Sequence, residues 1–224
     1  MKLFLSGGGS SEQSIEIDTQ FIKAIDKKRP VIYIPIAINK TKHPYTECLK
    51  WIKGSFGKLG FDNFIMWTEE DLKNKTEADF EQFSGVYIGG GNTFKLLKEL
   101  KEFGTFEIIK SLALKDVPIY GGSAGAVILA KTIIPAISAD LNRVGLKDFS
   151  ALNLTHGYDI WCHYDKDMDS TIREYMNKFK LNNIIALPED AGLYVAEKEI
   201  KTVGPNMVSV FADRKIEIRP GTII

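Results

Sequence analysis

A serine between glycines lies near the middle of the sequence, in the stretch VPIYGGSAGAVILA at residues 117–130. Gly121, Ser123 and Gly125 match the pattern Gly-x-Ser-x-Gly, in which a nucleophilic hydroxyl occupies a sharp turn between a strand and a helix. Small residues are needed two positions either side of the serine, because a β-carbon there would clash with the returning backbone. The pattern predicts that Ser123 attacks a carbonyl carbon, with a plain helix cap as the alternative.

The backbone near this serine could hold the negative charge that forms on the attacked oxygen. A helix starting at Ser123 has unpaired N–H groups and a positive dipole end, so the N–H of Ala124 is one expected donor. A second glycine-rich turn, IGGGNTFKLL at 88–97, follows another apolar run. Its Gly91, or in second place Gly90, would supply the other donor if the strands before the two turns are neighbours.

A serine hydroxyl needs a base to become a good nucleophile, and the chain has three histidines. His163 is the first choice because it follows the apolar run YDIWC, which places it at a strand end facing the same sheet edge as Ser123. His43 precedes a proline at a loop or helix start, which indicates a surface position. His156 lies earlier in the same segment as His163 and is the weaker candidate.

The base in turn needs an acid to orient it. The stretch IIALPEDAGLYV at 184–195 places two acids directly after a buried strand and a proline. Glu189 is the first choice to hold the imidazole of His163, and Asp190 is the reserve. The chain order of serine, histidine and acid differs from that of α/β-hydrolases, so the same geometry is expected on a different fold.

The two cysteines, Cys48 and Cys162, are too few for a disulfide scaffold, and their spacing matches no zinc site. His156, Cys162 and Asp165 also lack a recognisable metal-ligand spacing, so no metal is predicted. A first glycine-rich turn, SGGGSSEQS at 6–14, lacks the last glycine of the dinucleotide fingerprint and is interpreted as a plain turn into a helix. The sequence therefore predicts neither a cofactor nor thiol chemistry.

The overall composition favours an ordinary globular enzyme domain. The 224 residues are 44% hydrophobic, and 29 basic residues balance 29 acidic ones. This balance argues against nucleic acid or an anionic membrane as a partner and favours a small molecule or peptide. The first apolar run is far shorter than a signal peptide needs, and no later stretch approaches the length of a membrane span. We expect one cytoplasmic domain covering residues 1–224.

Short apolar runs alternate with amphipathic stretches along most of the chain. Runs apolar on both faces, typical of strands inside a parallel sheet, occur at 2–6, 31–37, 63–67, 85–90, 117–122 and 183–188. Helical periodicity occurs between or beside them, at 14–28, 44–59, 76–83, 92–114 and 124–130. The alternation predicts an α/β fold with a three-layer, doubly wound and mostly parallel sheet. From about residue 190 the period indicates short strands, hence C-terminal β-hairpins.

The blocks GGGNTFKLL, YGGSAGA, WCHYD and ALPED make the chain resemble the serine dipeptidase family of peptidase E and cyanophycinase. The resemblance runs over most of the chain. It implies a fold similar to the class I glutamine amidotransferase domain, with serine replacing cysteine at the elbow. It also implies a triad of Ser123 as nucleophile, His163 as base and Glu189 as third member, with the N–H groups of Gly91 and Ala124 as oxyanion donors.

The resemblance is weaker on the substrate side. The aspartyl preference of the family uses an arginine after the histidine, and in this region the chain has only Lys166 and Arg173 as cations. Arg173, whose guanidinium can grip both oxygens of a carboxylate, and Asn92 are the candidates for contacting substrate. A preference for an N-terminal aspartate is left open, as is a homodimer.

The sequence thus predicts a serine peptidase that hydrolyses small peptides. Two other functions stay open. The same site could serve an amidase or acyltransferase acting on small amides, or the glycine turns could bind an anion in a module without catalysis.

Overall fold

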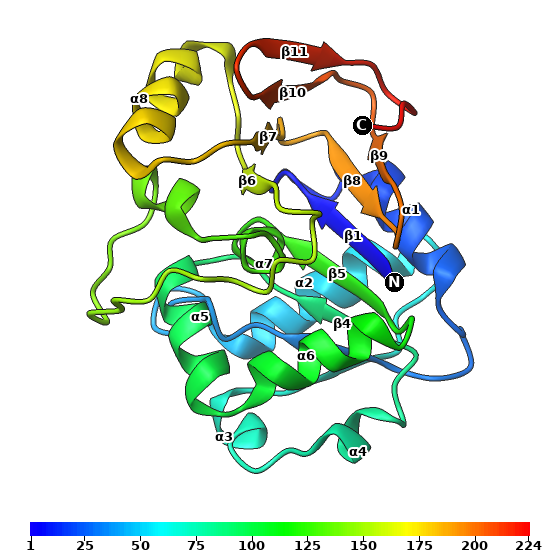
Figure 1. The fold of residues 1–224 in the computed structure, drawn as a ribbon. Helices are drawn as coiled ribbons and strands as arrows, with labels where there is room; N and C mark the ends of the chain where they lie inside the picture. The colour runs from blue at the N-terminus through cyan, green and yellow to red at the C-terminus, as the bar shows by residue number, and fades with distance from the viewer.

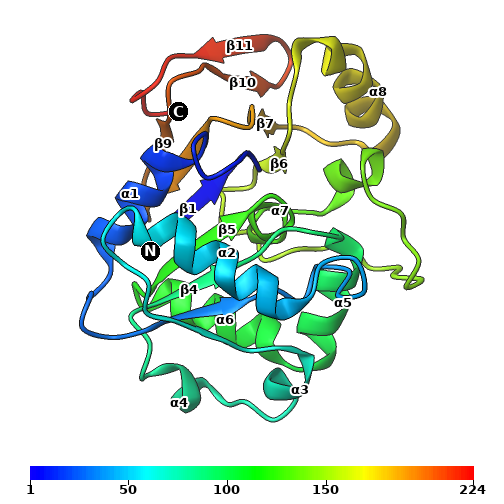
Figure 2. The ribbon, with the colours of Figure 1, turned by 180° about the vertical axis from the view of Figure 1, so that it is seen from behind.

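The computed structural model describes residues 1–224, which form two β-sheets with helices packed against them (Figure 1 and Figure 2). The larger sheet consists of β1 (Lys2–Ser6), β2 (Val31–Ile34), β3 (Phe64–Met66), β4 (Gly85–Ile88), β5 (Pro118–Gly122), β8 (Gly192–Val195) and β9 (Ile200–Val203). Its strand order is β3-β2-β4-β5-β1-β8-β9. The first five of these strands pair in parallel, and β8 and β9 are antiparallel additions at one edge.

Helices cover both faces of the larger sheet, as the opposite views of Figure 1 and Figure 2 show. One face carries α1 (Ile15–Ala24) and α2 (Tyr45–Gly57), and the other carries α5 (Thr93–Glu102), α6 (Thr105–Leu114) and α7 (Ala124–Leu129). The short helices α3 (Glu69–Leu72) and α4 (Glu77–Phe80) follow β3 in the chain. The predicted three-layer α/β fold with a mostly parallel sheet is confirmed.

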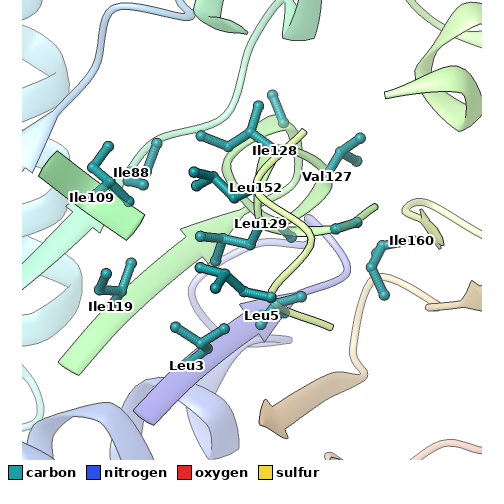
Figure 3. Close-up of a cluster of buried hydrophobic side chains, with 14 of the residues drawn as sticks. Leu3, Leu5, Ile88, Ile109, Ile119, Val127, Ile128, Leu129, Leu152 and Ile160 are labelled. Carbon is teal, nitrogen blue, oxygen red and sulfur yellow. The ribbon is translucent and has the colours of Figure 1, made fainter. Parts of the chain in front are cut away.

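The strands are apolar on both faces because alternate side chains enter two separate cores. In β1, Leu3 and Leu5 are fully buried against α7, as Figure 3 shows, whereas Phe4 packs into an aromatic cluster under α1 and α2. Ile128 and Leu129 of α7 are also fully buried in the first core. Each such side chain contributes about 1.5–3 kcal/mol on burial. This tightly packed core therefore holds the turn that begins α7 in a fixed position.

A smaller sheet lies beyond the end of β1 and consists of β6 (Asp159–Trp161), β7 (Ile184–Ala186), β10 (Val208–Phe211) and β11 (Lys215–Ile218). Its order is β11-β10-β7-β6, and β6 and β7 are parallel, joined through a 3-10 turn (Lys166–Met168) and α8 (Asp169–Phe179). The strand expected at 183–188 therefore belongs to this sheet and not to the larger one. The predicted C-terminal β-hairpins are found as β8–β9 and β10–β11.

Two predicted helices differ from the structure. The helix expected over 92–114 is divided into α5 and α6 at Gly104, whose φ of 72° is the left-handed conformation that glycine adopts without strain. The helix expected over 76–83 is only the single turn of α4. A further 3-10 helix, Ile134–Ser138, lies in the long segment between α7 and β6. No helix of the chain combines the length and the apolar character that crossing a membrane requires.

Candidate active site

Ser123 occupies a strained turn at the end of β5. Its φ of 48° and ψ of −108° lie outside the regions that non-glycine residues normally adopt. A β-carbon on Gly121 would come within 2.5 Å of the Gly125 carbonyl oxygen, and one on Gly125 within 2.2 Å of the Ile88 carbonyl oxygen. Both glycines are therefore required by close backbone approach. The Ser123 side chain makes no capping hydrogen bond to α7, so the alternative of a helix cap has no support in the geometry.

His163 directly faces the serine from the other sheet. Its Nε2 lies 2.8 Å from the Oγ of Ser123, close enough for a hydrogen bond. His163 comes two residues after the end of β6, with a φ of 53°, and its backbone N–H donates to the Gly7 carbonyl at 2.9 Å. The histidine expected from the sequence is thus the one that reaches Ser123.

Glu189 approaches the other side of the same imidazole. Its Oε1 lies 3.0 Å from Nδ1 of His163, and its Oε2 accepts a hydrogen bond of 3.3 Å from Nε2 of Gln13. A carboxylate at Nδ1 favours the tautomer that carries its proton there, which leaves Nε2 free to accept the proton of the serine. The hydrogen bond from His163 holds the pKa of Glu189 below its ordinary value. Asp190, the reserve candidate, instead accepts from Nδ2 of Asn206 at 2.5 Å.

The first glycine turn, interpreted from sequence as a plain connection, supports the histidine and the acid. Gly8 has a φ of 105°, and a β-carbon on it would lie 2.4 Å from Cε1 of His163. The N–H of Gly9 donates to the Glu189 carbonyl at 3.2 Å. Sequence reasoning missed this role, although the three glycines follow a strand and were the available signal. Through this turn, the segment that follows β1 forms part of the site.

Gly91 and Ala124 lie beside the serine as the glycine turns suggested. The strands that precede the two glycine turns, β4 and β5, are neighbours in the sheet, as this arrangement requires. Gly91 has a φ of 135°, and a β-carbon on it would come within 2.4 Å of the Ala37 carbonyl oxygen, so only glycine fits. Its N–H has no backbone acceptor, and the N–H of Ala124, as first residue of α7, has none within the helix. Both N–H groups are free for a ligand.

The two residues expected to contact substrate have other partners. Asn92 caps α5 by accepting from the Lys95 N–H at 2.9 Å, and its Nδ2 donates to the Leu141 carbonyl at 3.0 Å. Arg173, on α8, donates to the Ala212 carbonyl and lies 5.3 Å over the Phe211 ring. Neither lines a cavity beside Ser123. The structure does not bring Arg173 to the site, because the arginine packs on the smaller sheet.

Two cavities meet at Ser123, and Gly91 also lines both. The larger, about 500 Å³, lies on the side of α1 and α2 and is lined mainly by aromatic and glycine residues. The smaller, about 240 Å³, lies on the side of α5 and α7 and has small side chains around His163. A bond placed at Ser123 would therefore have room on both sides. His43, expected at the surface, is exposed but lies on the wall of the larger cavity.

The thiol next to the histidine belongs to a partly buried side chain. Burial raises the pKa of Cys162 to about 12, so the thiolate needed for nucleophilic attack does not form at neutral pH. Its Sγ points towards the carbonyl oxygens of Ser6 and Ser123, at 3.8 and 3.6 Å. No group of three or more histidine, cysteine, aspartate or glutamate side chains is arranged to hold a metal ion.

Comparison with known proteins gives matches over most of the chain. The sequence model described as peptidase family S51 matches residues 3–203. Peptidase E of Shigella flexneri serotype 5b is 28% identical over 194 residues, which cover 82% of this chain and 80% of that protein. Peptidase E of Haemophilus influenzae is 28% identical over 141 residues, 59% of each chain.

Two further likenesses concern a shorter segment and the fold. Pyridoxal 5'-phosphate synthase subunit PdxT of Fervidobacterium nodosum is 34% identical over 84 residues, only 38% of each chain. A crystal structure of a protein from Listeria monocytogenes, provisionally named peptidase E, superposes with a TM-score of 0.68 at 22% identity and covers 91% of this chain and 98% of that one. At this level of identity, the structural match supports the fold.

Proposed function

The chain belongs to peptidase family S51, a family of serine-type peptidases, and we propose that it hydrolyses small peptides through a triad of Ser123, His163 and Glu189. One observation carries the proposal. A serine on a strained turn has its Oγ 2.8 Å from Nε2 of a histidine, and Nδ1 of the same ring is 3.0 Å from a carboxylate. This is the order of contacts that an activated serine requires.

In the proposed first step, Nε2 of His163 takes the proton of Ser123 while Oγ attacks the peptide carbonyl carbon. Negative charge then develops on the carbonyl oxygen, and the free N–H groups of Gly91 and Ala124 are the donors that would hold it. A donor of this kind is worth about 3–4 kcal/mol in the transition state. Glu189 stays ionised because its pKa is lowered, so it stabilises the imidazolium that forms.

In the second half of the reaction, His163 returns the proton to the leaving amine and the peptide bond breaks. A water molecule, deprotonated by the same imidazole, then attacks the acyl group on Ser123. Release of the carboxylic acid restores the serine hydroxyl. The chain's own residues therefore suffice for each proton transfer.

The test is hydrolysis of a dipeptide panel by the wild-type protein and by Ser123→Ala, followed by amine release. Activity that vanishes in the variant supports the proposal, and activity that persists contradicts it. Turnover of small amides or esters without any dipeptide cleavage would instead favour an amidase or acyltransferase at the same serine. Failure of an active-site serine reagent to label Ser123, together with binding of anions, would favour a module without catalysis.

A further inference from the structure

The larger cavity beside Ser123 lies on the acyl side of the proposed reaction, and the inference drawn from it rests on the proposed function. His163 must give a proton to the leaving amine, so the leaving group has to lie on the histidine side of the serine. His163 lines the smaller cavity and not the larger one. The larger cavity is therefore left for the residue whose carbonyl is attacked.

Tyrosine rings form the floor of this cavity. Tyr33, Tyr87 and Tyr120 are 2%, 5% and 1% exposed, so their rings are fixed by packing. Tyr87 and Tyr120 are stacked with centroids 4.5 Å apart and an angle of 8° between their planes. Ile38 and Trp51 add apolar surface to the wall. A cavity of about 500 Å³ with such walls has the size and the surface for an aromatic side chain.

Two of the three tyrosine hydroxyls have no partner in the protein. Tyr120 donates to the buried Asp18 carboxylate at 2.6 Å, whereas no hydrogen bond is made by the hydroxyls of Tyr33 and Tyr87. Burial raises the pKa of both free phenols, so they stay protonated. Neither hydroxyl oxygen is among the fully buried side-chain atoms that lack a partner, so both are accessible from the cavity that the two residues line. A ligand in this cavity could therefore hydrogen bond both hydroxyls in place of water.

These free hydroxyls lie close to the reacting centre. Oη of Tyr87 is 3.4 Å from the place that a β-carbon on Gly122 would occupy, one residue before Ser123. Oη of Tyr33 is 3.3 Å from the corresponding place on Gly89. A residue bound at Ser123 would bring its main-chain polar groups close to these turns, within reach of the two hydroxyls, and would leave the rest of the cavity for its side chain.

The charges around the cavity oppose an acidic side chain. No lysine or arginine lines it, and its one lining carboxylate is Glu47. A second carboxylate, Asp18, lies behind the wall, bonded to Ser14 and Tyr120. A substrate carboxylate placed here would lose part of its water and meet no lysine or arginine, with the imidazole of His43 as the one basic group on the wall and like charges nearby.

We propose that the larger cavity selects an uncharged aromatic side chain on the acyl residue of the substrate and rejects an acidic one. The hydroxyls of Tyr33 and Tyr87 hydrogen bond the main-chain polar groups of that residue. They are specificity-determining and positioning groups for the reaction at Ser123.

The experiment compares two irreversible reagents, the diphenyl phosphonate analogues of phenylalanine and of aspartate. Ser123 Oγ attacks phosphorus and expels phenol, so the adduct forms on the serine and is located by mass spectrometry. We expect inactivation by the phenylalanine analogue to be at least about tenfold faster. A faster reaction of the aspartate analogue, or of a lysine analogue added as a third reagent, would overturn the inference.

Substitutions then test the two hydroxyls. Tyr33→Phe and Tyr87→Phe each remove one oxygen and should slow labelling by the phenylalanine analogue about three- to tenfold. Tyr45→Phe is the matched control, because the hydroxyl of Tyr45 donates to Glu69 and does not line the cavity. Unchanged labelling rates in both cavity variants would show that the two hydroxyls do not position the acyl residue.

The failure of this inference is distinguishable from failure of the proposed function. A small phosphonofluoridate that has no side chain reports only whether Ser123 is activated. If it labels Ser123 while neither amino-acid analogue does, the cavity does not bind the acyl residue and the inference is wrong, but the catalytic serine stands. If none of the reagents labels Ser123, both proposals fall.

Discussion

Ser123 and His163 come from different sheets, and yet Nε2 of His163 lies 2.8 Å from Oγ of Ser123. The serine follows β5 of the larger sheet, and the histidine follows β6 of the smaller one. The contact between the two sheets is therefore where the candidate chemistry lies.

Replacing Ser123, the proposed nucleophile, should abolish activity without affecting the fold. For Ser123→Ala we expect a loss of about 10⁶-fold in kcat. The Ser123 side chain makes no helix-capping hydrogen bond, so the free energy of unfolding should change by less than about 0.5 kcal/mol. Dipeptide hydrolysis and urea denaturation measure the two effects. Ser111→Ala, which removes a hydroxyl bonded to Glu77 far from the site, is the control for activity.

Substitution of Glu189 should lower kcat far more than substitution of its neighbour Asp190. Glu189→Gln removes the negative charge and leaves one acceptor oxygen where two now serve Nδ1 of His163 and Nε2 of Gln13, so it should lower kcat by about 10³–10⁴-fold. Asp190→Asn, whose side chain bonds Asn206 and not the imidazole, should keep nearly full activity. Comparable losses in both variants would mean that Glu189 has no special role.

The support beneath the imidazole is tested by Gly8→Ala. A β-carbon at Gly8 would lie 2.4 Å from Cε1 of His163 and must displace the ring, which should reduce kcat at least about 100-fold. The positive φ of Gly8 adds backbone strain of its own. Gly60→Ala separates the two effects, because Gly60 has a φ of 77° and no atom within 4 Å of the added carbon. The control should lose stability but keep its activity.

The buried Asp18 should make stability fall as the pH rises. Burial raises its pKa from 3.8 to about 6, in spite of the hydrogen bonds from Tyr120 and Ser14. The folded chain therefore holds this proton more tightly than the unfolded chain. The resulting stabilisation is complete below about pH 4 and is lost as the pH passes through about 6.

Asp18→Asn removes this titration. Between pH 4 and pH 7 the free energy of unfolding of the wild-type protein should therefore fall, relative to the variant, by on the order of 2–3 kcal/mol. Urea titrations at several pH values measure the difference. Asp62→Asn, at an exposed site, should follow the wild-type curve. If the difference in free energy of unfolding between the wild-type protein and Asp18→Asn does not change with pH, Asp18 does not cause the expected loss of stability.

Local patterns predicted much of this molecule. The glycines around Ser123 restrict a single turn, and their spacing in the sequence is sufficient to indicate it. The apolar runs gave the strands because burial on both faces leaves no polar positions. The same runs do not say which sheet a strand joins, and for this reason β7 was expected in the larger sheet.

Contacts between distant segments were harder to predict. The turn at Gly8 supports His163, which is 155 positions further along the chain, and the sequence around neither residue indicates this contact. Arg173 was considered because of its charge, but its direction depends on how α8 packs over Phe211. The tyrosines of the larger cavity have the appearance of core residues in the sequence, since only the folded chain leaves two of their hydroxyls without partners.

The central position of β1 has a consequence for the order of synthesis. β1 is made before the other strands of this sheet, but its neighbours in the sheet are β5, at residues 118–122, and β8, at residues 192–195. The strand has neither pairing partner until synthesis has reached β5. Ser123 meets His163 and Glu189 later still, so a nascent chain that ends before residue 189 carries no assembled Ser-His-Glu arrangement.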